Sequence, residues 1–149
     1  MMFSTRARYG LKAVVDLANE YGNGPQPLSA LAKKQGISES YLEQLLRTLR
    51  QAHIVDAIRG INGGYVLARE PVSISVESVL EVLEGSTAVA DCVSSDGGVC
   101  QNACTCSTRP LFLKLQAKIN AVLAETSILD LATDHTEQKK RIEDAKNIS

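Results

Sequence analysis

The residues with the clearest chemical potential are four cysteines that lie close together in the 149-residue chain. Cys92, Cys100, Cys104 and Cys106 follow the spacing C-x7-C-x3-C-x-C within residues 86–108, a stretch without helical or strand periodicity. Neighbouring thiolates bind soft or borderline metals, and iron–sulfur clusters are held mostly by cysteine. The pattern lacks the two C-x2-C-like pairs typical of structural zinc sites. It therefore favours an iron–sulfur site, with zinc binding, thiol redox chemistry and inert cysteines as the alternatives.

The composition places these cysteines in a soluble chain of one domain, or one domain with an extension. The N-terminal residues MMFSTRARYG lack the apolar core of a signal peptide, and no run of eighteen apolar residues occurs. We therefore expect a cytoplasmic protein that does not span a membrane. In that compartment, cysteines are more often metal ligands or redox thiols than structural disulfides.

Residues 38–67 combine an amphipathic helix with a glycine-tipped hairpin. Ser38 is a candidate N-cap, and the helix that follows, to about residue 52, has one apolar and one polar side. The apolar side holds Tyr41, Leu42, Leu45, Leu46 and Leu49, and the polar side holds Ser40, Glu43, Gln44, Arg47 and Arg50. A strand-like step at residues 54–55 and a second at 65–67 flank the turn RGINGG, residues 59–64. This order is typical of a winged helix-turn-helix, whose helix reads the DNA major groove.

Two further helices precede this unit. The pattern predicts a first helix from Ser4 or Thr5 to about residue 21, and a short one over residues 29–35 that Gly36 joins to the next helix. Cations in the first turns of the first helix oppose the helix dipole, so phosphate contact or simple solvation must explain them. Residues 1–69 carry nine Lys/Arg against five Asp/Glu, whereas residues 70–149 carry seven against twelve. The DNA-reading half is thus predicted to be the basic half.

The C-terminal half is predicted to contain a helix over residues 76–84 that Gly85 ends, and a long helix from about residue 109 to 125. The long helix carries an apolar stripe that faces either a partner chain or its own domain: Leu111, Leu115, Ile119, Val122 and Leu123. A short helical turn is expected at residues 128–131, followed by a charged, flexible tail over 133–149. His53 is expected to be a packed or capping residue.

Taken together, these segments resemble the IscR/NsrR/CymR family of bacterial winged-helix transcription regulators. The match is carried by STRARYGLKAVVDLA (4–18), LSALAKKQGISESYLEQLLRTLRQAHIV (28–55), RGINGGYVLAREP (59–71), ISVESVLEVLEG (74–85) and the cysteine stretch. The resemblance implies a mostly α fold with a small β wing: a winged helix-turn-helix over 1–72, then a cluster-binding loop (86–108) and a dimerisation helix (about 109–125) within 73–132. It also implies a homodimer on a roughly palindromic double-stranded operator.

The resemblance assigns DNA contacts by position. Bases and phosphates would face the reading helix, Arg59 would enter a narrow minor groove, and the start of the first helix would anchor the DNA backbone. The residues so assigned are Ser4, Thr5, Arg6, Tyr9, Ser38, Ser40, Tyr41, Glu43, Gln44, Arg47, Arg59, Gly60, Asn62, Gly63 and Gly64.

The resemblance also implies an iron–sulfur cluster, of the two-iron [2Fe–2S] kind rather than the four-iron kind. Cys92, Cys100 and Cys106 align with the family's three cysteine ligands. The histidine that serves as fourth ligand in IscR corresponds to Arg109 here, and the aspartate of the nitric-oxide-sensing branch corresponds to Arg8. The expected fourth ligand is therefore Cys104, with the partner subunit's Glu43 as the alternative.

The expected function, as the resemblance implies, is that of a DNA-binding regulator that represses iron–sulfur assembly genes according to cluster supply or redox stress. Two alternatives remain: a metal- or thiol-based sensor regulator without a cluster, and a redox or metal-handling protein that does not act on DNA. An enzyme is not expected, since the sequence shows no paired nucleophile and base and no phosphate-cradling loop.

Overall fold

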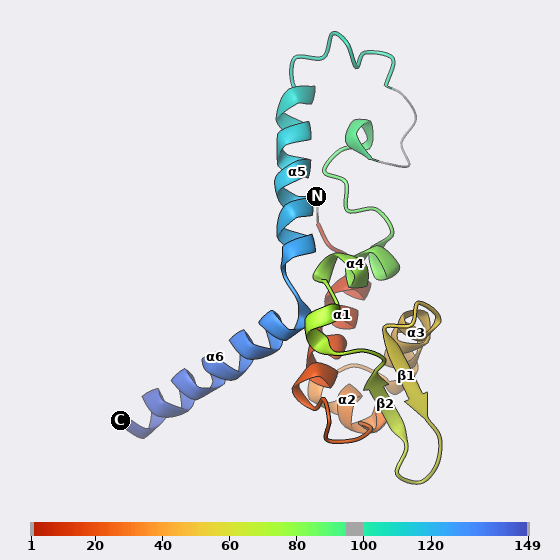
Figure 1. Ribbon diagram of the computed structural model, residues 1–149, viewed down its shortest axis with the longest axis vertical. Helices are drawn as coiled ribbons and strands as arrows, with labels where there is room; N and C mark the ends of the chain where they lie inside the picture. The colour runs from red at the N-terminus through yellow and green to blue at the C-terminus, as the bar shows by residue number, and fades with distance from the viewer. Residues whose placement is uncertain (1, 95–99, 149) are drawn as a thin grey trace.

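The computed structural model describes residues 2–94 and 100–148, and its helices and one small sheet are arranged as in Figure 1. The helices are α1 (Thr5–Asn19), α2 (Leu28–Gln35), α3 (Glu39–Gln51), α4 (Val76–Glu84), α5 (Arg109–Glu125) and α6 (Ile128–Ile148), with short 3-10 turns η1 (Pro71–Ser73) and η2 (Asp91–Val93). Strands β1 (Val55–Ile58) and β2 (Gly64–Leu67) form the sheet. The mostly α fold with a small β wing is confirmed.

Helix α3 is fixed by the leucines that the periodicity predicts to be buried. Leu42, Leu45, Leu46 and Leu49 are at most 1% exposed, because spacings of three and four residues put them on one side of the helix. Ser38 begins the helix, and its Oγ accepts the Tyr41 N–H at 3.1 Å. The opposite side of α3 is consequently left to polar residues.

Helix α1 is joined to α2 by one buried charge and lies against α4 at one close approach. Asp16 is nearly buried and pairs with Lys34 Nζ at 2.8 Å, while its other oxygen accepts from Gln35 Nε2 at 3.0 Å. Both partners lie on α2, so this carboxylate is satisfied where an unpaired one would be costly. On another side of α1, a Cβ added at Gly10 would overlap the Leu83 side chain, so glycine allows α4 to lie close against α1.

One residue in the left-handed region lies before α3 and another lies after it. Gly36 (φ 68°) joins α2 to α3, and His53 (φ 59°) follows its end. The His53 N–H donates to Arg50 O at 3.0 Å and the Ile54 N–H to Leu49 O at 3.0 Å, which is the Schellman arrangement. His53 is thus a capping residue through its backbone, while its side chain is exposed rather than packed.

The wing is the antiparallel pair β1–β2, in which Val55 faces Leu67 and Ile58 faces Gly64. The Gly63 N–H donates to Gly60 O at 3.0 Å and closes the turn between the strands. Two further hydrogen bonds of 2.9 Å join Gln26 to Tyr65, so the wing is held against the loop that precedes α2.

The C-terminal helices extend away from this body (Figure 1). No described residue of α5 is buried. The expected short turn at 128–131 is corrected: it continues as α6 through Ile148, since no Gly or Pro interrupts the segment. Ile128 and Ala132 anchor this helix in the core, and residues 133–148, expected to be a flexible tail, are helical and exposed.

Candidate nucleic-acid interface and cysteine loop

The solvent side of α3 presents the polar residues assigned from the sequence. Ser40, Glu43, Gln44 and Arg47 are exposed, and Tyr41 is half-buried. Arg47 Nη2 lies 3.6 Å from Glu43 Oε1, one helical turn away, and both side chains are about half exposed or more, so this ion pair is weak. Ser38 differs from the others, because its hydroxyl already caps the helix.

The start of α1 lies beside the middle of α3. Arg6 Nη2 donates to Thr48 Oγ1 at 3.0 Å, and the Thr48 hydroxyl donates to Gln44 O at 3.1 Å. The rings of Tyr9 and Tyr41 meet edge to face with centroids 6.4 Å apart. The sequence placed Arg6 and Tyr9 at this surface, but it did not indicate Thr48, whose role depends on a contact 42 residues away.

Ser4 is more constrained than the sequence suggests. Its Oγ accepts the Ala7 N–H at 3.1 Å as the N-cap of α1, and the same hydroxyl donates to Glu84 Oε2 at 2.5 Å. The Ser4 backbone N–H also points to this carboxylate, at 3.1 and 3.3 Å from its two oxygens. Glu84 was not indicated by the sequence, because it lies 80 residues further along the chain.

The tip of the wing is open to solvent. Arg59, Gly60 and Asn62 are exposed, whereas Gly63 and Gly64 are half-buried at the base of the turn. Gly60 has φ 119°, and a Cβ at Gly63 would overlap the Ile58 carbonyl oxygen, so the turn requires small residues at these positions. Ile61 is fully exposed between them, an apolar tip that we did not single out from the sequence.

The cysteines lie in the loop of residues 86–108, hereafter the cysteine loop; its residues 95–99 are outside those described. All four cysteines are free thiols, Cys104 exposed and the others half-buried. Within the described residues, no three His, Cys, Asp or Glu side chains come together as a metal-binding group. The donor type fits an iron–sulfur cluster, but this conformation does not assemble the ligands.

One thiol of the loop has a distinct environment. Cys106 Sγ lies 3.3 Å from Thr108 Oγ1, just before α5 begins at Arg109. The pKa of the Cys106 thiol is lowered by hydrogen bonds from the Thr108 side chain and from the backbone of Thr108 and Arg109, with a smaller contribution from the Arg109 charge. These interactions favour the thiolate, which is the form that binds metal or attacks an electrophile.

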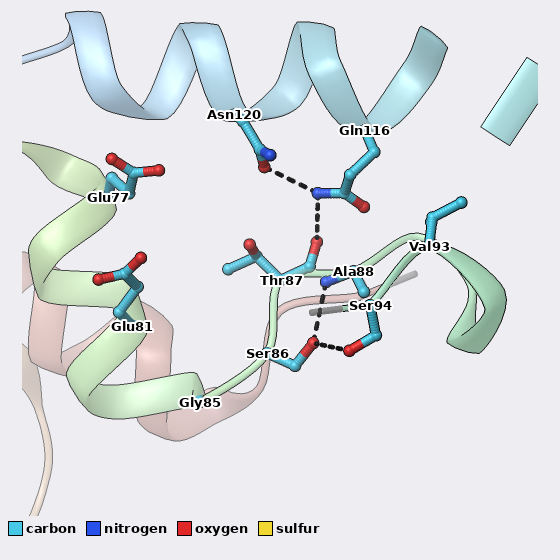
Figure 2. A pocket seen from close by; sticks show the side chains of 10 residues that line it. All are labelled: Glu77, Glu81, Gly85, Ser86, Thr87, Ala88, Val93, Ser94, Gln116 and Asn120. Carbon is cyan, nitrogen blue, oxygen red and sulfur yellow. Dashed lines mark hydrogen bonds between the residues drawn. The ribbon is translucent and has the colours of Figure 1, made fainter. Parts of the chain in front are cut away.

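The first part of the cysteine loop is tied to α5 by one glutamine. Gln116 Oε1 accepts the Val89 N–H at 2.8 Å, and its Nε2 donates to Asn120 Oδ1 at 2.8 Å and to Thr87 O at 3.4 Å. Gln116, Asn120 and Thr87 line a polar cavity of about 160 Å³, and Figure 2 shows them with Glu77 and Glu81 of α4 on the other side. The loop is thus linked to α5 at Gln116 and continuous with α4 through Gly85.

Comparison with known proteins decides the family. A profile of the Rrf2 family, described as an iron-dependent transcriptional regulator, matches residues 3–134. The chain belongs to the Rrf2 family. It is 36% identical to the HTH-type transcriptional regulator CymR of Bacillus subtilis over 133 residues, covering 89% of this chain and 91% of that protein. It is 35% identical to the HTH-type transcriptional regulator IscR of Aliivibrio salmonicida over 148 residues, covering 99% and 86%.

Solved Rrf2 structures share the fold. CymR, described as the global cysteine regulator of B. subtilis, superposes with a TM-score of 0.76 at 38% identity, covering 89% of this chain and 97% of that chain. IscR of T. potens gives a TM-score of 0.73 at 38% identity, covering 93% and 90%. The expected family is confirmed, and this Rrf2 chain is a DNA-binding transcription regulator of the winged-helix type. Within residues 2–94 and 100–148, no helix has the length and apolar character needed to cross a membrane.

Proposed function

We propose that this Rrf2 protein is a homodimeric, iron–sulfur-dependent repressor of iron–sulfur assembly genes that responds to cluster supply or redox stress. The observation that carries the proposal is the pairing, in one chain, of an exposed polar edge on α3 with four free thiols on a loop that leads from α4 to α5. The first feature supports sequence readout, and the second supports a soft-metal or redox signal.

DNA reading is assigned to α3, the wing and the start of α1. The Ser40, Glu43, Gln44 and Arg47 side chains would face the major groove, where amides and guanidinium groups read base edges. The exposed Arg59 at the wing would enter the minor groove, whose negative potential favours arginine. Thr5 and Arg6 would contact the DNA backbone beside α3.

The second copy of the chain is expected to cover α5. Leu111 is 55% exposed, Leu115 43% and Val122 61%, on the helix predicted to dimerise. Contiguous apolar surface of this kind usually marks an interface. A twofold dimer would present two copies of α3 to two successive major grooves, which requires a roughly palindromic operator.

The cluster is assigned to Cys92, Cys100 and Cys106, with Cys104 as the preferred fourth ligand, and the two-iron form is expected. These thiolates would hold the cluster, which would supply a redox-sensitive group when bound. Gln116 of α5 holds the first part of the loop, at Thr87 and Val89, shortly before Cys92. The partner's Glu43 stays the alternative ligand; on this chain Glu43 pairs weakly with Arg47.

A second candidate is a thiol-responsive regulator without a cluster. It is favoured by the lowered pKa of the Cys106 thiol and by the separation of the ligating groups in this conformation. A protein of similar sequence and fold, CymR, is described as a cysteine regulator. Both candidates keep the same DNA-reading surface and differ only in the chemistry of the loop.

Anaerobic purification tests the proposal directly. We expect a coloured protein with iron and acid-labile sulfide in equal amounts, and with visible absorption whose band shape separates two-iron from four-iron clusters. The Cys92→Ser variant should lose the colour, while Cys104→Ser should change the spectrum if Cys104 is the fourth ligand. A colourless wild-type protein that contains zinc or no metal would overturn the cluster assignment and leave the thiol-responsive candidate.

A further inference from the structure

The tip of the wing carries an apolar side chain that stays in solvent. Ile61 is 103% exposed, the highest value among the large apolar residues that the structure describes, and it is not part of the hydrophobic core. Turn tips are usually formed by Gly, Pro, Asn, Asp or Ser, whose backbones or side chains suit the bend. The free energy of burying this isoleucine is therefore available only to another molecule.

The backbone holds Ile61 in a defined place. The Gly63 N–H donates to Gly60 O at 3.0 Å, which closes a turn with Ile61 and Asn62 as its two central residues. The wing is also tied at its base to the loop that precedes α2 by two hydrogen bonds of 2.9 Å. The connection between β1 and β2 extends beyond the helices (Figure 1). Because isoleucine is stiff at χ1, a contact made by this side chain costs little conformational entropy.

The neighbours of Ile61 indicate which kind of surface it meets. Arg59 and Asn62, a cation and an amide, are exposed on either side of it in the chain. Residues 57–69 contain two arginines and no Asp or Glu. Proteins that bind the DNA minor groove combine Arg, Lys, Asn or Gln with inserted apolar side chains, isoleucine among them. The wing tip has both components of such a contact.

An apolar side chain in the minor groove distinguishes between base pairs. The groove floor of A·T and T·A pairs shows only acceptors, whereas a G·C pair adds the guanine amino group, which is a donor. The Arg59 guanidinium and the Asn62 amide can donate to the acceptors. Isoleucine over a guanine amino group would remove water from a donor that it cannot satisfy, which is costly. The tip is therefore suited to base pairs without that amino group.

We propose that Ile61 is a specificity-determining residue of the wing: its side chain enters the minor groove beside Arg59 and selects against guanine amino groups. The inference rests on the proposed function, since it takes Arg59 to the minor groove. It goes further in one respect. Arg59 responds to negative potential, whereas Ile61 adds the rejection of one chemical group.

The test isolates the minor-groove amino group. Inosine presents the major-groove atoms of guanine and lacks only the amino group, so alternating poly(dI-dC) and poly(dG-dC) offer the same major-groove chemistry. Each copolymer competes with one fluorescein-labelled duplex at a fixed salt concentration, and anisotropy gives the ratio of the two affinities without knowledge of the operator. We expect the wild type to prefer poly(dI-dC).

Substitutions at the tip decide how much of this preference belongs to Ile61, because a guanine amino group would also obstruct Arg59. Ile61→Ser should reduce the preference about three- to tenfold, since the serine hydroxyl is smaller and can accept from the amino group. Ile61→Leu keeps an apolar side chain of the same size and should keep most of the preference.

Two controls separate the tip from the rest of the wing. Ile58→Ser makes the same change on β1 of the same hairpin, where Ile58 is 46% exposed, and should leave the ratio within about twofold of the wild type. Arg59→Ala should weaken binding to both copolymers and lower the salt slope, whereas Ile61→Ser removes no charge and should leave the slope unchanged. Circular dichroism checks that each variant is folded.

Three results would overturn the inference: an unchanged ratio in Ile61→Ser, an equal loss in Ile58→Ser, or a loss in Ile61→Leu as large as that in Ile61→Ser. The wing would still contact DNA in each case if Arg59→Ala weakened binding and lowered the salt slope. If Arg59→Ala changed neither quantity, the assignment of the wing to the minor groove would fail together with the inference.

Discussion

The stability cost of replacing Gly36, in the turn between α2 and α3, follows from its backbone conformation. Gly36 has φ 68° and ψ 32°, and a Cβ added there would meet nothing within 4 Å. Gly36→Ala therefore introduces no clash and isolates the cost of holding a side chain in the left-handed region. That cost is about 1–2 kcal/mol, and the smaller entropy of alanine in the unfolded chain offsets about 0.4–1 kcal/mol. We expect a net loss of about 1 kcal/mol in the free energy of unfolding.

A substitution to glycine, the reverse of the change at Gly36, can be made just after the other end of α3. His53 occupies the equivalent left-handed position after the helix, with φ 59° and an exposed side chain. His53→Gly relieves the backbone strain without removing buried contacts, so it should raise the free energy of unfolding by about 0.5–1 kcal/mol. His53→Ala is the control: it removes the imidazole and keeps the strain, and its stability should stay within about 0.5 kcal/mol of the wild type.

Urea denaturation at one fixed protein concentration measures both changes, because the stability of the proposed dimer would depend on concentration. For a chain of this size, 1 kcal/mol corresponds to a Tm change of about 2–4 °C. The reasoning would be refuted if Gly36→Ala were neutral, or if His53→Gly and His53→Ala were equally stabilising. The second result would mean that the imidazole, rather than the backbone, destabilises the native state.

Three further predictions concern the cap, the reading surface and the dimer. Ser38→Ala removes the N-cap of α3 and should lower the free energy of unfolding by about 1 kcal/mol, whereas Ser38→Asp should restore it in urea denaturation. Arg47→Ala should weaken operator binding and reduce the salt slope by about one per subunit in titrations at several salt concentrations, while Arg141→Ala on α6 should leave both unchanged. Val122→Glu places a charge on the exposed apolar stripe of α5 and should shift the protein toward monomer in sedimentation velocity, and an unaltered dimer would place the interface elsewhere.

The elements that hold the reading surface were predictable because their signals are local. The leucines of α3 repeat at three and four residues, Ser38 precedes them as a cap, and glycines mark the wing, so each feature follows from neighbours in the chain. The assignment of Arg6 and Gln44 to one surface came from the family resemblance, not from local signals.

The parts that were not predicted depend on contacts between distant residues. Glu84 looks like an ordinary helix-ending carboxylate until α4 packs on α1 and brings it to Ser4. His53 gave no sign of a left-handed conformation, since its cap is made by backbone groups. The length of α6 was underestimated because its charged residues resemble a disordered segment in composition, although the segment has no helix-breaking residue.

The close packing of Leu83 against Gly10 helps to set the distance between Glu84 and Ser4. Leu83, the residue before Glu84, packs where a Cβ of residue 10 would lie, so the spacing of α1 and α4 at this level is that of a helix backbone against a leucine. The Ser4 backbone N lies 3.1 and 3.3 Å from the two Glu84 carboxylate oxygens, close to the limit of about 3.2 Å for a good hydrogen bond. A Cβ at residue 10 would lie 2.3 Å from Leu83 Cδ1, so the leucine or the two helices would have to shift. A substitution at residue 10 would thus act at a distance, releasing Ser4 without altering either partner of the contact. Gly10 thus sets the distance between α1 and α4 at the level of this contact, and replacing it is expected to lower the free energy of unfolding.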